Sequence, residues 1–412
     1  MSTAAPAEVQ AAAEENASLV AILRGRWEAL KGGDVGSLPV LVGIVGITLF
    51  FYLKQSIFIE PANFTNLIGQ MAGVTVIAIG VVFVLLIGEI DLSIGYVSGI
   101  AGIVVAELQK PENGFLHNRP GLVAIACAIG AGAAIGALQG SIVAIVGVPS
   151  FVVTLAGLLI WQGVILKDLG TEGVIGIQDH QINDVANYVL TKNTGWTVAI
   201  VFTAGLAAAS LGTWWGRRRA GLPTGNPVLT VARVVFFGGL AFAAVWRCNQ
   251  SRGVPLVGLI VLFVVVLGAY VAGRTTFGRH VYAVGGNAEA ARRAGINVKL
   301  IRILVFMISG SMAALGGIIF ASRLNSVDLT AGGGTILLDA ISAAVIGGVS
   351  LFGGRGRVSG ALFGGLIIGM VANGIDLVGY TDAVKFITTG LILLAAVTLD
   401  TVARRRQAAA GR

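Results

Sequence analysis

Charged residues are scarce in this sequence. Of its 412 residues only 12% are Asp, Glu, Lys or Arg, whereas 56% are hydrophobic. A soluble protein typically carries about 25% charged residues. This number of polar side chains is too small to cover the surface of a water-soluble protein of this length. Lipid must therefore surround most of the chain.

Cysteine and histidine are also rare. Cys127 and Cys248 have no metal-ligand spacing, so they indicate neither a disulfide framework nor a zinc site. His117, His180 and His280 are scattered through loops and form no catalytic cluster. The chain also lacks the phosphate-binding loop GxxxxGK[ST], and no lysine directly follows a glycine. We therefore expect no metal or cofactor in this chain, and any ATP that drives it should bind to a partner subunit.

Apolar segments of spanning length recur along the chain, and each crossing needs about 20 residues. The tenth segment is short for a full span, so it is expected to be a half-helix or a re-entrant piece. The sequence thus predicts an all-α, polytopic integral membrane protein with about 10–12 transmembrane helices, including broken or re-entrant helices. The segments are approximately 38–58, 67–88, 92–108, 121–147, 149–168, 196–215, 228–246, 254–273, 301–322, 338–352, 358–377 and 383–402.

Sixty glycines suit such a membrane domain, because helices in lipid pack through small residues. Gly132, Gly136 and Gly140 lie one turn apart on one helix face. This spacing favours close packing against a neighbouring helix, and flexible hinging during transport is the alternative.

Lysine and arginine indicate the orientation of the membrane domain. If the N-terminus is inside and the segments alternate, 19 of the 28 Lys and Arg residues lie on the inner side. This bias is expected because basic loops resist translocation. We predict a multi-pass protein of the bacterial plasma (inner) membrane with both termini cytoplasmic: a tail at 1–36, the membrane domain at 37–405 and a tail at 406–412. The net charge of +8 then belongs to inner loops, and no nucleic-acid partner is implied.

Two loops are long enough to hold structure of their own. The outer loop, 170–195, is polar and acidic and has room for a small helix. In the inner loop, 274–302, Asn287 suits an N-cap, residues 288–294 suit a short helix, and Gly295 suits its C-terminal stop. Ala290, Ala291 and Ala294 share one face of that helix. A short capped helix with a small apolar face suits docking of another protein, although a plain surface helix is the alternative.

The first helix break lies in the segment GEIDLSIG, where Glu89 and Asp91 sit in apolar surroundings. Buried carboxylates are costly in lipid, so each should face a cavity or a partner. Together with Ser93 they are candidates for the substrate pathway or its gate. The alternative is that Asp91 and Ser93 only cap the following helix.

The second helix break is rich in glycine and carries two arginines, namely Gly353, Gly354, Arg355, Gly356 and Arg357. An ordinary basic inner loop would account for at least one of these arginines. Both breaks combine an apolar run, a glycine-rich interruption with charge, and a helix of small residues. That common design suggests a two-fold internal repeat, as importers often show.

Three segments in this order resemble a known family: GEIDLSIG, VYAVGGNAEAARRAGINV and LDAISAAVIGGVSLFGGRGRVSGALFGGLIIGM. They are similar to the monosaccharide-import permeases of the ABC superfamily, in the ribose and xylose group, and the resemblance covers residues 40 to 405. It implies a permease dimer, cytoplasmic ATP-binding subunits and an extracytoplasmic sugar-binding protein. The family's coupling segment matches 287–295, including Asn287, Glu289, Ala290, Ala291 and Gly295.

The resemblance favours D-xylose as the cargo. The chain has extra material across 213–253 relative to the ribose type, as xylose permeases do; ribose, galactose and inositol stay open. An ion-coupled secondary transporter with Glu89 and Asp91 as coupling carboxylates is the alternative of another class, but the docking-like inner loop argues against it. A membrane enzyme would need DxxD-like carboxylates or a catalytic histidine, and the acidic cluster EID supplies neither.

Overall fold

The computed structural model describes residues 38–110, 119–222, 224 and 226–409. The predicted tail at 1–36 lies outside the described residues. The described residues between 40 and 188 and between 255 and 409 form one compact unit, and those between 189 and 254 belong to a second. The helices and strands of the larger unit are α3 (Leu38–Lys54), η1 (Ser56–Ile59), α4 (Pro61–Leu86), α5 (Ile94–Gln109), α6 (Gly121–Ser141), η2 (Ile142–Val146), α7 (Ser150–Leu169), β1 (Val174–Gly176), α8 (His180–Asn187), α11 (Leu256–Arg274), α12 (Thr276–Gly286), α13 (Ala288–Arg293), α14 (Val298–Leu324), β4 (Ser326–Asp328), α15 (Ile336–Ile346), α16 (Gly360–Val378) and α17 (Asp382–Ala409).

The predicted all-α membrane fold is confirmed. Each of the twelve apolar segments falls on a helix, and eight helices among the described residues are long and apolar enough to cross a membrane. The helix at the tenth segment, α15, has only 11 residues, so it is a short piece as expected. Helix α17 continues to Ala409, past the end predicted for the membrane domain.

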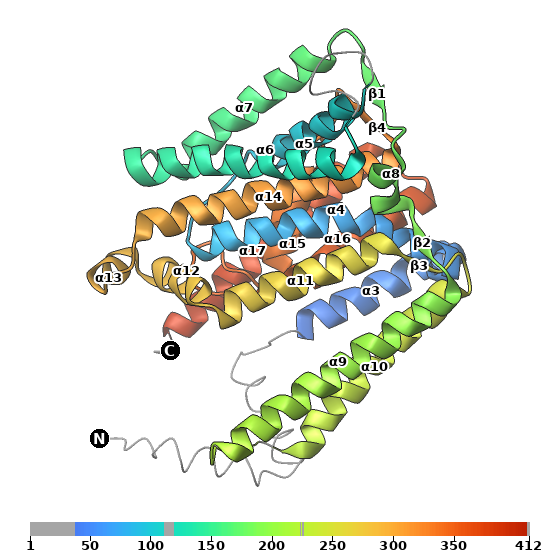
Figure 1. Cartoon of the computed structure of the whole chain (residues 1–412), viewed down its shortest axis with the longest axis vertical. Helices are drawn as coiled ribbons and strands as arrows, with labels where there is room; N and C mark the ends of the chain where they lie inside the picture. Colours follow the sequence, from blue (N-terminus) through green and yellow to red (C-terminus); the bar gives the residue numbers. More distant parts are fainter. Residues whose placement is uncertain (1–37, 111–118, 223, 225, 410–412) are drawn as a thin grey trace. The chain divides into compact units, whose positions relative to one another are not determined.

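Helix α14 lies at the centre of the larger unit, between α6 and α5 on one side and α4 on the other (Figure 1). Helices α15 and α16 pack against α4, and α17 packs against α15. Helix α4 begins at Pro61, whose missing N–H costs nothing in a first turn. The most hydrophobic window of α4 is 83% buried, so α4 and α14 together form the core of the unit.

The crossing of α6 and α14 confirms the predicted close packing of glycines. An added Cβ on Gly136 would overlap the carbonyl oxygen of Phe306. Gly132 and Gly310 face each other, and a Cβ on either would overlap the carbonyl oxygen of the other. The two backbones therefore touch, a spacing that only glycine permits.

The outer loop holds the small helix that was predicted there. Asp179 caps α8 by accepting hydrogen bonds from the backbone N–H groups of Gln181 and Ile182. Strand β1 pairs antiparallel with β4, which follows the end of α14. The loop is thus held to the rest of the larger unit by its strand, and α8 also packs against α14.

The smaller unit consists mainly of α9 (Lys192–Arg219) and α10 (Pro227–Asn249), which lie side by side (Figure 1). Strands β2 (Val189–Leu190) and β3 (Val254–Pro255) pair where the chain enters and leaves it. Trp196 stacks on Phe242 with ring centroids 6.0 Å apart, and Gly238 receives the side chain of Thr203. At the other end of α9, Arg219 lies 4.3 Å from the ring centroid of Trp215.

Candidate functional site

Asp91, in the break between α4 and α5, is buried and fully hydrogen-bonded. Its Oδ1 accepts from the backbone N–H of Ser93 at 3.0 Å and from Ser93 Oγ at 2.7 Å. Its Oδ2 accepts from Ser309 Oγ of α14 at 3.0 Å. The carboxylate therefore holds Ser93, the residue before α5, and anchors it to the central helix. Ser93 is the N-cap residue of α5, but neither its side chain nor that of Asp91 makes the capping hydrogen bond that the alternative supposed.

Gln139 of α6 joins the same buried network. Its side-chain oxygen is placed 2.9 Å from Ser93 Oγ, while its Nε2 is buried without a partner. The single proton of Ser93 already serves Asp91, so a hydroxyl–carbonyl contact would leave Gln139 unsatisfied. Turning the amide over lets its NH2 donate to Ser93, which then donates to Asp91. The network thereby ties α5, α6 and α14 together at one level.

Glu89, unlike Asp91, has a cationic partner. Its Oε1 lies 3.0 Å from Nη2 of Arg302, in the first turns of α14. The side chains are 15% and 30% exposed, so this pair is partly shielded from water. Arg302 is the last residue of the inner loop 274–302 as the sequence defines it, and its charge alone does not predict this contact. The ion pair connects the first break to the helix that follows the inner loop.

Glu89→Gln is expected to lower transport about tenfold while membrane insertion stays normal, because it leaves a partly buried Arg302 without its anion. Initial uptake rates in vesicles containing equal amounts of permease measure the effect. Arg302→Gln should lower transport similarly, and the double variant should lose little more than either single one. The exposed carboxylate of Glu60 offers the matched control, Glu60→Gln. Normal uptake by the Glu89 variant would contradict a role for the pair.

The two helix breaks, far apart in sequence, meet in space. The backbone N–H of Gly354 donates to the carbonyl of Leu86 at 2.9 Å, and a Cβ on Gly353 would lie 3.0 Å from the backbone of Gly88. Arg355 and Arg357 are exposed, whereas Val358 is buried. The second break thus packs its glycines against the first break and turns its arginines outward.

The inner loop forms the capped helix predicted for it. Asn287 Oδ1 accepts from the N–H of Ala290 at 2.9 Å, and Gly295, with φ of +85°, ends the helix in the left-handed region. The predicted apolar face is divided, however. Ala291 is only 5% exposed and packs into the core, whereas Ala290 and Ala294 are exposed. Ala291 therefore anchors α13, and Ala290 and Ala294 lie on its exposed surface.

Glu289 braces α13 from the opposite side. Its carboxylate pairs with Arg292 at 2.5 Å and with Arg293 at 3.1 Å. These exposed pairs contribute little stability individually, but both link residues of the same short helix. They leave the apolar side of α13 unobstructed.

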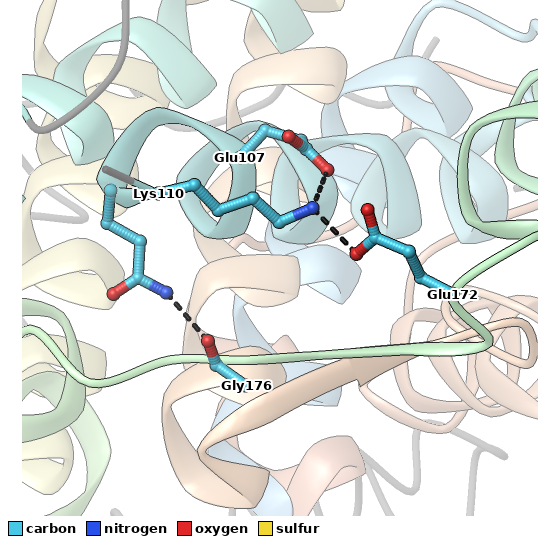
Figure 2. A network of polar contacts seen from close by, with 5 residues as sticks. Glu107, Lys110, Glu172 and Gly176 are labelled. Atoms are coloured by element: carbon cyan, nitrogen blue, oxygen red, sulfur yellow. Dashed lines mark hydrogen bonds and ion pairs between the residues drawn. The ribbon is translucent and has the colours of Figure 1, made fainter. Parts of the chain in front are cut away.

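A polar network at the end of α5 lies against the outer loop (Figure 2). Lys110 Nζ lies 2.7 Å from both Glu107 and Glu172, and the side chain of Gln109 donates to the carbonyl of Gly176. Burial lowers the pKa of Lys110, but the hydrogen bonds and charges of the two glutamates outweigh it and raise the pKa above its usual value. Lys110 thus stays charged and holds the outer loop to α5.

Asp339 is a buried carboxylate outside the predicted site residues. It lies in α15, where Thr335 donates to Oδ2 at 2.6 Å and Thr389 of α17 donates to Oδ1 at 3.1 Å. The signal was present, because Asp339 interrupts an apolar run just as Glu89 does. The described residues contain no group of three His, Cys, Asp or Glu side chains placed to hold a metal ion.

Comparison with known proteins places this arrangement in a family. Residues 63–397 match the family described as branched-chain amino acid transport system / permease component. The chain is 35% identical over 410 residues to the xylose transport system permease protein XylH of Escherichia coli (strain K12), covering 98% of this chain and 100% of that protein. It is 34% identical over 343 residues to the ribose import permease protein RbsC of the same strain, covering 83% and 87%. It is 30% identical over 366 residues to the fructose import permease protein FrcC of Rhizobium meliloti, covering 88% and 84%. No solved structure matches.

Proposed function

Since this chain belongs to the branched-chain amino acid transport system / permease component family, we propose that it is the membrane-spanning subunit of an ATP-binding-cassette importer that carries D-xylose into the cell. The observation that supports xylose is the end-to-end match to a xylose permease, which covers 98% of this chain. The matches to the ribose and fructose permeases cover 83% and 88% of it. Ribose, galactose and inositol are the competing cargoes.

The energy for import comes from a cytoplasmic ATP-binding subunit, because this chain has no phosphate-binding lysine loop. An extracytoplasmic sugar-binding protein delivers the sugar. The permease works as a dimer, either with itself or with a sibling. These partners follow the family resemblance, and the capped helix α13 offers the ATP-binding subunit a defined surface.

Both termini and the inner loop 274–302 lie in the cytoplasm, with the outer loop 170–195 on the opposite side. The charge bias of Lys and Arg supports this orientation. The membrane domain spans 37–405, between tails at 1–36 and 406–412. Single cysteines placed at positions 180 and 288 test this orientation. An impermeant thiol reagent added to intact cells should label position 180 and spare position 288. The reverse pattern would mean that the orientation is inverted.

The candidate residues take distinct roles in this proposal. Glu89, Asp91 and Ser93 hold the first break, which lies on the sugar pathway or its gate. The glycines of the second break, residues 353, 354 and 356, let the backbone pass close to the first break, and Arg355 and Arg357 face the cytoplasm. Residues 287–295 dock the ATP-binding subunit through the exposed Ala290.

Reconstitution tests the cargo and the energy source together. Liposomes holding the permease, its ATP-binding subunit and its sugar-binding protein should accumulate labelled xylose only with ATP on the cytoplasmic side. Excess unlabelled xylose should compete with the labelled sugar for uptake, whereas the same concentration of ribose should compete only weakly. Accumulation driven by an ion gradient without ATP would establish the secondary-transporter alternative, and preferential uptake of ribose would correct the cargo.

A further inference from the structure

Helix α12, which precedes the docking helix α13, ends in direct backbone contact with both breaks. A Cβ on Gly285 would overlap the carbonyl oxygen of Leu86, at the end of α4, and would lie 2.7 Å from the backbone nitrogen of Gly354. Those two backbone groups are hydrogen-bonded to each other at 2.9 Å. Three chain segments therefore meet at one point, with no side chain between them.

A second contact of α12 lies one turn earlier. Tyr282 Oη donates a hydrogen bond to the carbonyl of Gly356 at 2.8 Å. Burial raises the pKa of Tyr282, and the charge of Arg357 only partly offsets this, so the hydroxyl keeps the proton that it donates. Helix α12 is thus attached to the second break at two levels, through Gly285 and Tyr282.

The other flank of α13 is attached as well. Helix α14 begins at Val298, soon after α13 ends, and its Arg302 pairs with Glu89 in the first break. Only Asn287 separates α12 from α13. A displacement of α13 must therefore move α12, α14 or both, and each of these helices is attached to a break.

We propose that α12 is the element that transmits motion from the docking helix to the two breaks, with Gly285 and Tyr282 as its positioning residues. This inference rests on the proposed function, because it supplies a route by which an ATP-binding subunit acts on the sugar pathway. Close-packed segments have little slack and transmit displacement. The receiving segment contains Gly353 and Gly354, with φ of +86° and +72°, and glycine has access to more backbone conformations than any other residue.

Two adjacent glycines give a matched test. Gly285→Ala places a methyl group against Leu86, whereas a Cβ on Gly286 meets nothing within 4 Å. In the reconstituted importer, Gly285→Ala should retain the ATP-binding subunit, since α13 is unchanged. Its xylose uptake and its stimulation by loaded binding protein should each fall about tenfold, within the 5- to 150-fold range of typical couplings. Gly286→Ala should match the unmodified importer in both assays.

If Gly285→Ala does not insert into the membrane, a milder variant tests the role of α12. Tyr282→Phe removes one hydroxyl without adding bulk, and stimulated hydrolysis should fall about fivefold while basal hydrolysis persists. Unchanged stimulation in Tyr282→Phe, or normal uptake in Gly285→Ala, would contradict the proposal that α12 transmits motion to the two breaks. Neither result would contradict the proposal that the chain is an importer subunit. Failure of the unmodified importer to accumulate xylose would overturn the proposed function instead, so the two failures are distinguishable. Loss of the ATP-binding subunit from an inserted Gly285→Ala variant would also overturn the inference, because the defect would then be one of docking.

Discussion

A chain carrying Gly136→Val is expected not to accumulate as folded permease. The crossing of α6 and α14 brings the carbonyl oxygen of Phe306 to the place where the valine Cβ would stand. Backbone atoms cannot rotate out of the way as a side chain can, so the two helices must separate. Overpacking a well-packed core typically costs about 1–3 kcal/mol, and we expect the upper end or more because α14 is the central helix of its unit.

Gly130→Val on the same helix is the matched control. Gly130 is exposed, and a Cβ there meets nothing within 4 Å. Size-exclusion profiles of the detergent-solubilised chains should show the monodisperse peak nearly lost for Gly136→Val and kept for Gly130→Val. Equal peaks from both variants would mean that α6 can move away from α14 without loss of the fold.

The helices were predictable from sequence because each depends on a local property of the chain. A run of about 20 apolar residues must form a helix in lipid, where every backbone group needs an internal partner. The cap at Asn287 and the stop at Gly295 were predictable for a similar reason, since the bonds that define them span only a few residues. Local interactions thus determine both ends of α13.

The partners of the buried groups were not predictable in the same way. Glu89 pairs with Arg302, and Asp91 binds Ser309 across 218 positions of sequence. Which of many polar residues reaches a given carboxylate depends on how α4, α5 and α14 pack, and one sequence does not encode that packing in any short pattern. The sequence also did not predict that Ala291 is buried while Ala290 and Ala294 are exposed. That difference depends on which other segments of the fold pack against α13.

Gly295→Val is expected to weaken the complex with the ATP-binding subunit strongly. Gly295 has φ of +85°, and a β-branched residue there is strained by roughly 1–2 kcal/mol. The last turn of α13 must then unwind or point elsewhere. Gly295→Asn is the matched control, because asparagine tolerates the left-handed region far better. Copurification of the ATP-binding subunit should fall at least tenfold for valine and stay near normal for asparagine.

Ala290→Trp should give the same loss by a different route. Ala290 is exposed on the helix that Ala291 anchors, so a tryptophan there leaves the permease fold intact and fills the space that a docked partner needs. Ala290→Ser, which adds one oxygen, should dock normally. Both disruptive variants should insert and still accept the loaded binding protein outside. Their phenotype then differs from that expected for Gly285→Ala, which keeps its ATP-binding subunit but is stimulated about tenfold less by the loaded binding protein. If the tryptophan and valine variants instead copurify the subunit at normal yield and import at the normal rate, docking takes place on another part of the inner surface.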